Sequence, residues 1–283
     1  MTQFRPARLS DQPALEAFLV AHIETSVFLL LNLRDHGPLG GTHPRAMRYF
    51  IREVGADITG CFGISTTGMI MPQLPGPTDW QAVASLLIGQ HIEGVIGQAD
   101  QCAALLAATH LTHAPTNLAS REKLYALDLC DLIVPDHPGH IVPLDITMRD
   151  VAVPWRAAYQ TEALGTPQDQ AYPRAMDEID AYIIAGSHQM LIQNGACVAM
   201  TGFNAQLPEL VQIGGVFTPP EQRSQGHARR AVALHLQQAA AQGVPRSVLF
   251  AANTAAEKAY ESIGFKHIGH FSITLFTNPE VLT

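Results

Sequence analysis

The chain has 283 residues, of which 47% are hydrophobic and 15% charged, and its formal net charge is −8 at pH 7. This length suits two domains, and the hydrophobic content excludes a disordered chain. Phosphate neutralisation needs clustered Lys and Arg, so this acidic sequence argues against a nucleic-acid partner. No apolar run is long enough to cross a bilayer and no secretory signal opens the sequence, so we expect a cytoplasmic protein without a membrane partner.

The first half shows a faint series of short elements. We predict a strand at 4–6, a helix capped by Ser10 and Asp11, a helix at 26–33, strands at 48–52, 58–65 and 68–71, helices at 78–87 and 99–106, and final strands around Val95 and at 124–134. Three prolines and a glycine then forbid both a continuing helix and a central strand. We therefore place a linker at 135–143 between domains at 1–134 and 144–283, each long enough to fold alone.

The second half gives clearer signals. Asp150 can cap a helix that begins near 151, and a second helix runs over 173–185 until Gly186 stops it. Asn194-Gly195 is a strong hairpin signal between strands at 189–193 and 196–203. A strand at 210–217, a helix at 228–242, a strand at 247–251, a helix at 254–263 and a strand at 270–276 complete the order βααβββαβαβ. The first half repeats this order faintly, which suggests duplication.

The run 214–228 places a strand, a bend and a glycine-bearing turn directly before a helix. Amides at the start of a helix have no internal partner and lie at the positive end of the helix dipole, so they can bind a pyrophosphate. Gly226 and Ala228 keep side chains out of the way. The spacing matches neither the P-loop nor the dinucleotide-binding glycine motif.

Two motifs in this half resemble those of a known family. The pattern R-x-x-G-x-A at 223–228 resembles the acetyl-CoA loop of the GNAT N-acetyltransferases, and the run from Asn253 through Tyr260 to Phe265 resembles the second signature of that family. The resemblance covers residues 145–277 well, whereas 1–134 match only in the order of elements. It implies an α/β (α+β) fold of two tandem GNAT-like domains, each a mixed, mostly antiparallel sheet flanked by helices, with the first a degenerate copy.

The resemblance implies direct attack of an amine on the thioester of acetyl-CoA, without an acyl-enzyme intermediate. Backbone amides near Val216 would polarise the thioester carbonyl, and Gly214-Gly215 would allow the strand to splay there. We expect the ring of His227 to point to solvent while its amide binds phosphate. The residues that the resemblance assigns to the cofactor are Val216, Phe217, Thr218, Arg223, Ser224, Gln225, Gly226, His227, Ala228, Asn253, Ala256 and Tyr260.

The same resemblance assigns Tyr260 as the general acid that protonates the departing CoA thiolate, although a tyrosine packed on the inner face of its helix is the alternative. Glu162, near the end of the first helix of this half, and Glu209, before the central strand, are rival candidates for contact with the acceptor amine. Either can be an ordinary exposed carboxylate, since water chains can replace a dedicated base. His188 is a minor candidate for the same cleft.

The corresponding segment of the first half, 68–80, has the wrong chemistry for phosphate. Its prolines lack N–H groups and Asp79 would repel phosphate at the helix start, so we predict a copy that no longer binds CoA. Such a copy can still shape the acceptor pocket between the two domains.

The cysteines and histidines lack the spacing of metal ligands, so we expect no metal and interpret Cys61, Cys102, Cys130 and Cys197 as buried free thiols. The expected partners are acyl-CoA and an amine acceptor, with a homodimer left open. The alternative functions are a non-catalytic acyl-CoA-binding or sensing protein, and a structural protein with an accidental motif. The sequence does not identify the acceptor.

Overall fold

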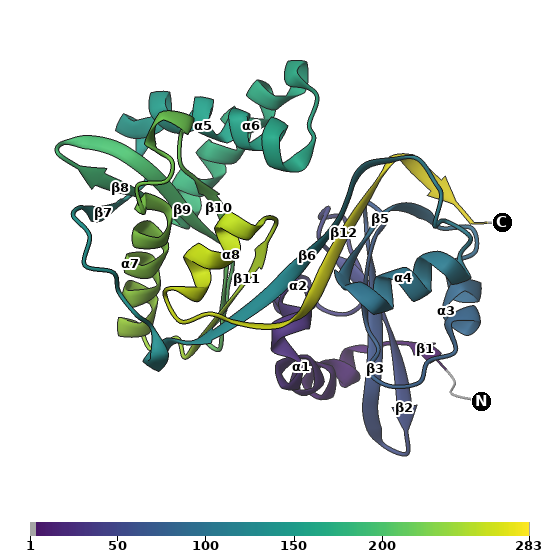
Figure 1. Ribbon diagram of the computed structural model, residues 1–283. Helices are drawn as coiled ribbons and strands as arrows, with labels where there is room; N and C mark the ends of the chain where they lie inside the picture. The colour runs from purple at the N-terminus through teal and green to yellow at the C-terminus, as the bar shows by residue number, and fades with distance from the viewer. Residues whose placement is uncertain (1–3, 283) are drawn as a thin grey trace. The chain divides into compact units, whose positions relative to one another are not determined.

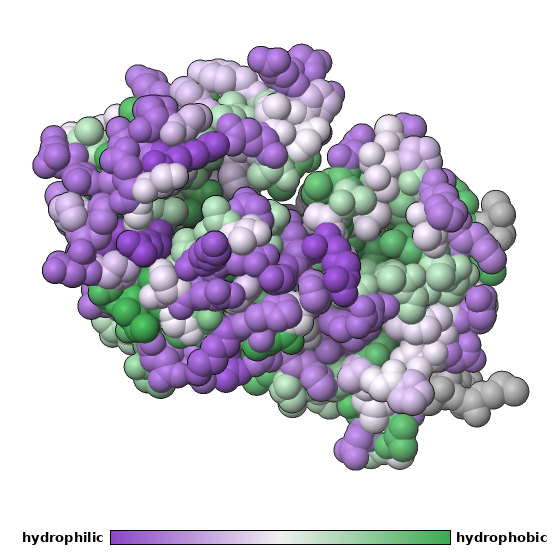
Figure 2. Space-filling model, viewed as in Figure 1, coloured by the Kyte–Doolittle hydropathy of each residue, from purple (hydrophilic) through white to green (hydrophobic). Residues whose placement is uncertain are grey.

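A computed structural model of the protein describes residues 4–282, and the chain forms two compact units. The first unit holds the chain up to Lys123 and takes it up again from Gly269, while the second holds Leu124–Ile268. No helix among residues 4–282 is long and apolar enough to span a membrane. On the face shown in Figure 2, hydrophilic residues cover most of the surface of the second unit.

The first unit contains a sheet in which β12 follows β5 in the order β1-β2-β3-β4-β5-β12. Its strands and helices are β1 (Phe4–Pro6), α1 (Gln12–Ala21), α2 (Ile23–His36), β2 (Met47–Val54), β3 (Asp57–Ser65), β4 (Met69–Gln73), α3 (Trp80–Leu86), β5 (His91–Gln98) and α4 (Ala99–Ala108). β4 and β5 are parallel, whereas β1 to β4 pair antiparallel. Buried side chains such as Phe62, Ile70 and Leu105 form the core of this unit.

The second unit contains a sheet in the order β6-β11-β10-β9-β8-β7. Its elements are the end of β6 (Thr116–Asp128), β7 (His140–Pro143), α5 (Arg149–Leu164), α6 (Gln168–Ala185), β8 (His188–Gln193), β9 (Ala196–Gln206), β10 (Val211–Phe217), α7 (His227–Ala241), β11 (Arg246–Ala251), α8 (Thr254–Glu261) and the start of β12 (Lys266–Val281). β7 to β10 pair antiparallel, and β10 and β11 pair parallel. The sheet is thus mixed and mostly antiparallel.

Helices cover both faces of the second sheet (Figure 1). α5 and α6 pack through Val153 and Ile179 on Met190 and Met200 of β8 and β9. α7 packs through Val232 and Leu236 on the other face, in a core that also holds side chains of β6, β10, β11 and α8. The strand order brings the ends of β10 and β11 and the starts of α7 and α8 to one edge of this unit.

The element order β1 to β6, with α1 to α4 between, is the same as the order β7 to β12, with α5 to α8 between, as the sequence predicted. Each repeat nevertheless ends in the sheet of the other. β12 pairs antiparallel with β5 in the first unit, with Phe271 opposite Gln98 and Leu275 opposite Gly94. Gly94 is needed there, because a Cβ would lie 2.2 Å from the carbonyl oxygen of Thr274. β6 takes the corresponding place beside β11 in the second unit.

The compact units therefore differ from the division predicted from the sequence. The proline-rich segment 135–143 lies wholly inside the second unit and includes β7, while the division falls at 123/124 and again at 268/269. Prolines show where a helix or strand must end, but they carry no information on which sheet receives the strand before them.

Local predictions were more successful, except among the cysteines. Asn194 and Gly195 have φ of 51° and 78°, which is the left-handed conformation that a tight hairpin turn requires. Cys61 and Cys102 are buried as predicted, and Cys197 is half-buried. Cys130 is exposed, so the prediction of four buried thiols was wrong. This residue lies in the short 3₁₀ helix Leu129–Asp131, where a strand ends at the surface.

Candidate functional site

β10 and β11 pair only at the start of β10. Their parallel register covers Val211–Ile213, opposite 247–249, and the pairing of β10 with β9 shifts between Gly214 and Phe217. Gly215 has φ of +62° at this bulge. The regular pairing of β10 is therefore lost at Gly214-Gly215, where the sequence predicted that the strand would splay. The backbone of Val216 lies beyond the last residue of β10 that pairs with β11.

A buried histidine supports this bulge from the α5 and α6 face. His188 is 1% exposed, and its Nε2 occupies the space where a Cβ would lie on Gly202 (2.1 Å) or Gly215 (2.8 Å). Its ring stacks on Tyr182 at 3.6 Å. Burial lowers the pKa of His188 to about 3, so the imidazole is neutral. His188 thus lies behind the strand as part of the packing.

A polar network beside His188 joins α5 to α6. Arg156 Nε donates to Glu178 Oε2 at 2.5 Å, and Gln160 Nε2 donates to the same carboxylate at 2.7 Å. The Arg156 guanidinium also lies 4.7 Å from the ring centroid of Tyr159. Because Arg156 is only 6% exposed, this pairing compensates a buried charge and fixes the helix pair behind the bulge.

The loop after β10 is held by the arginine of the R-x-x-G-x-A motif. Arg223 Nε donates to the carbonyl oxygen of Thr218 at 3.0 Å, and Arg223 Nη2 donates to Glu162 Oε2 at 2.7 Å. Ser224 and Gly226 both have left-handed backbones, with φ of 63° and 84°. The Arg223 side chain therefore shapes the loop and reaches α5, while the turn it stabilises leads into α7.

The N-terminus of α7 carries amides without acceptors. No side chain caps this helix at Gly226, and within residues 4–282 no group accepts a hydrogen bond from the amides of 224–228. The amides between Ser224 and Ala228 are thus available to a ligand. The His227 side chain is 3% exposed and lies against the ring of His137, so the prediction that it points to solvent was wrong.

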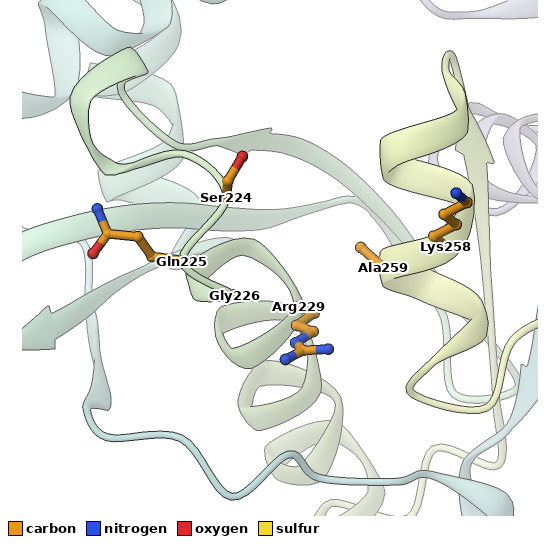
Figure 3. A pocket seen from close by; sticks show the side chains of 6 residues that line it. All are labelled: Ser224, Gln225, Gly226, Arg229, Lys258 and Ala259. Atoms are coloured by element: carbon orange, nitrogen blue, oxygen red, sulfur yellow. The ribbon is translucent and has the colours of Figure 1, made fainter.

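A pocket of about 390 Å³ lies between this loop and α8 (Figure 3). Ser224, Gln225, Gly226 and Arg229 form one side and Lys258 and Ala259 the other. Sequence reasoning missed the two cations. A signal existed, because Arg229 directly follows the first motif and Lys258 lies two residues before Tyr260 in the second.

α8 brings the second motif to the same pocket. Asn253 caps this helix by accepting from the amide of Ala256 at 3.0 Å, so the Ala256 amide is already occupied. Tyr260 is 8% exposed on the inner face of α8, and its ring makes an edge contact with Phe265. Tyr125, from β6, donates to Glu261 at 2.9 Å and ties the end of the helix to the sheet.

The two carboxylates proposed for the acceptor lie at opposite ends of β10. Glu162 is half-exposed and paired with Arg223, beside the loop that follows the strand. Glu209 lies in the turn before Val211, so the seven residues up to Val216 separate it from the bulge by on the order of 20 Å. The structure therefore brings Glu162, and not Glu209, to the end of the strand where the bulge lies. In the described part of the chain, no three His, Cys, Asp or Glu side chains form a group suited to a metal.

The corresponding loop of the first unit is filled by its own groups. Asp79 caps α3 by accepting from the amide of Ala82 at 3.1 Å. Arg52 is 5% exposed and donates to the carbonyl oxygens of Pro75 (2.7 Å) and Pro77 (3.1 Å). The carbonyl oxygens of this loop therefore point toward the Arg52 guanidinium. The start of α3 carries the carboxylate of Asp79.

Comparisons with known proteins agree with the fold. A solved Drosophila protein matches at a TM-score of 0.66 and 13% identity, covering 98% of this chain and 100% of its own. A GCN5-related N-acetyltransferase from Sphaerobacter thermophilus matches at 0.59 and 11%, covering 99% and 97%. A tandem GNAT protein from the clavulanic acid biosynthesis pathway, solved without AcCoA, matches at 0.55 and 14%, covering 97% and 98%. No curated protein matches the chain.

At these identities the solved structures show the fold. Both sequence motifs lie within a single match to a family model. Residues 150–265 match the model of the acetyltransferase (GNAT) family, from the start of α5 to the end of the second motif. Near full-length coverage by a tandem protein extends the GNAT fold to both units. The chain therefore contains a domain of the acetyltransferase (GNAT) family at residues 150–265.

Proposed function

We propose that the protein is an N-acetyltransferase that transfers an acetyl group from acetyl-CoA directly to an amine of a small-molecule or peptide acceptor. The observation that carries this proposal is the uncapped start of α7, where the amides of 224–228 have no acceptor within residues 4–282. A diphosphate satisfies several such amides at once and complements the positive end of the helix dipole.

The pocket beside these amides adds two full positive charges. Arg229 lies in the first turn of α7, and Lys258 lines the same pocket from α8. Ser224 and Gly226, both left-handed, turn successive peptide groups toward a concave surface, which is the backbone arrangement that binds anions. These residues fit the diphosphate of CoA, and Asn253, whose side-chain Oδ1 caps α8, keeps its side-chain NH₂ for the pantetheine arm.

The chemistry would take place at the end of β10. The acceptor nitrogen attacks the thioester carbonyl, the carbon–sulfur bond breaks, and the amine loses one proton while the thiolate gains one. Backbone amides at Val216 and Phe217, beyond the last pair with β11, polarise the carbonyl. Tyr260 donates the proton to sulfur, and Glu162 or a water chain receives the proton of the amine.

The first unit contributes no second cofactor site in this proposal. The Asp79 cap places a carboxylate where the diphosphate would lie, and Arg52 holds the loop carbonyls inward. One chain should therefore bind one CoA.

A calorimetric titration of the full chain with CoA tests the binding step, and release of free thiol from acetyl-CoA with a panel of amines tests the transfer. We expect binding of one CoA per chain and turnover with at least one amine. The burial of Tyr260 in the core favours one alternative, a non-catalytic acyl-CoA sensor. Binding of CoA without turnover on any amine would support that alternative, and no binding would refute both.

A further inference from the structure

The segment 135–139 runs along the N-terminal end of α7 and is attached to it by side chains. Arg230 Nη1 donates to the carbonyl oxygen of Pro135 at 2.6 Å, and Arg230 Nη2 lies 3.4 Å from that of Gly139. Between these two points, His137 Nε2 lies 2.7 Å from the carbonyl oxygen of Gln225. The segment predicted to be a linker therefore reaches the loop that forms the pocket.

The direction of the hydrogen bond from His137 to Gln225 follows from its acceptor. A backbone carbonyl oxygen can only accept, so His137 Nε2 carries the proton and donates it. His137 Nδ1 lies 3.0 Å from the carbonyl oxygen of Pro138, and donation to both oxygens at once requires the imidazolium. The bond to Gln225 needs only a proton on Nε2, which the neutral ring can also supply.

Gln225 is a sensitive point of the loop because its neighbours, Ser224 and Gly226, are both left-handed. Its carbonyl group and the amide of Gly226 belong to one planar peptide unit, and in a trans peptide they point in opposite directions. A donor that holds the carbonyl of Gln225 on the His137 side therefore turns the Gly226 amide the other way. Gly226 lines the pocket.

The space around the ring supports this arrangement. A Cβ on Gly226 would lie 3.4 Å from His137 Cδ2, so the ring packs directly under that residue. The ring of His137 also makes an edge contact with the buried ring of His227, with centroids 5.2 Å apart. His137 is thus fixed on two sides and cannot leave Gln225 without losing its packing.

We propose that His137 is a positioning residue for the diphosphate site, which it orders by donating a hydrogen bond to the Gln225 carbonyl and so aiming the Gly226 amide into the pocket. This inference rests on the proposed binding of acyl-CoA. It predicts an effect on affinity for the cofactor, and none on the chemical step once the cofactor is bound.

Three variants of the full chain test the inference. His137→Phe keeps a ring against His227 but removes the donor, whereas His137→Gln can donate through its own Nε2. His140→Asn is the matched control, because His140 is exposed at the start of β7, directly after this segment. The dissociation constant for CoA is measured by calorimetry, and KM for acetyl-CoA and kcat come from initial rates with the best amine acceptor.

We expect His137→Phe to raise both the dissociation constant for CoA and KM for acetyl-CoA about tenfold, the loss of one hydrogen bond, while kcat at saturation stays within about twofold. His137→Gln should restore most of the affinity, and His140→Asn should match the wild type. Wild-type affinity in His137→Phe, or equal losses in the Phe and Gln variants, would overturn this inference alone. A wild-type chain that binds no CoA would overturn the proposed function and this inference with it.

Discussion

Tyr260 is a suitable general acid for thioester chemistry, because a phenol can give its proton to a departing thiolate at little cost in free energy. Its neighbours Lys258 and Ala259 line the pocket, while Tyr260 itself faces the core of the unit with 8% exposure. The inner-face position that the sequence left as an alternative is thus what the structure shows.

Tyr260→Phe should lower kcat about a hundredfold, because it removes the proposed proton donor. KM for acetyl-CoA should stay within about twofold, since the diphosphate site is unchanged. Tyr125→Phe is the control: it removes another buried hydroxyl of this unit, the donor to Glu261, and should reduce stability by about 1 kcal/mol without changing kcat. Equal losses of kcat in the two variants would assign Tyr260 to packing.

Two buried histidines make the second unit sensitive to acid. Burial lowers the pKa of both His188 and His235 to about 3, from an ordinary value of 6.5. The folded unit keeps them neutral, whereas the unfolded chain takes up a proton below about pH 6.5. The stability they contribute is therefore fully present above that pH and decreases as the pH falls toward 3.

Between pH 7.5 and 5 each histidine should reduce the free energy of unfolding by about 2 kcal/mol. His235→Phe, which can keep the stack on Phe203, should remove about half of this combined pH dependence. Urea unfolding at the two pH values measures it, with Trp155 as the reporter in a Trp80→Phe background. An unchanged difference in the variant would show that His235 is protonated in the folded unit.

At the scale of elements, the two repeats use the same strand–loop–helix unit in opposite ways. α3 is preceded by Asp79, whose carboxylate caps it, and the loop before it is bound by Arg52. α7 is preceded by Gly226, which has a left-handed backbone and provides no side-chain cap. A few side chains therefore decide which of two helix starts can receive an anion.

Gly226→Ala should weaken CoA binding by more than about tenfold, since alanine at φ +84° is strained by about 1 kcal/mol or more and its Cβ would lie 3.3 Å from Arg229 Nε. Gly243→Ala is the matched control, with φ of +90° beyond the other end of α7 and no atom within 4 Å of its Cβ. Both variants should lose similar stability, measured by thermal unfolding. Similar CoA affinity in the two would contradict a role for the α7 start.

The sequence predicted elements better than their partners. The Asn194-Gly195 turn, the helix stop at Gly186 and the unit before α7 could be predicted because each depends on local conformation. The side-chain contacts of Arg223 and His227 could not, because a motif gives residue types and not directions. The exchange of β6 and β12 was missed for a related reason, since an apolar alternation identifies a strand without identifying its neighbour.

At the scale of the whole molecule, the exchanged strands make each half dependent on the other. The second unit takes β6 from the first repeat, and Tyr125, Leu127 and Leu129 from that part of the chain are buried in its core. A fragment that begins after the proline-rich segment lacks these side chains and leaves β11 as an open edge. The expectation that each half can fold alone therefore conflicts with how the sheets are completed.

A fragment of residues 135–283, which keeps β7, should be less stable than one of 116–283 and should aggregate, because only the longer fragment contains β6. Both lack the partner of the end of β12, so the comparison tests β6 and the turn that follows it. Size-exclusion chromatography and thermal unfolding measure the difference. A monomeric short fragment as stable as the longer one would contradict the dependence.

The exchange has a consequence for proteolysis. A single cut between Pro135 and Gly139 would leave the upstream piece with its last strand embedded in the downstream sheet, and the downstream piece with its last strand in the upstream sheet. The two pieces would migrate together on a native gel and separate only in denaturant. Because the strands are exchanged, cleavage of the backbone beside the pocket would not dissociate the protein.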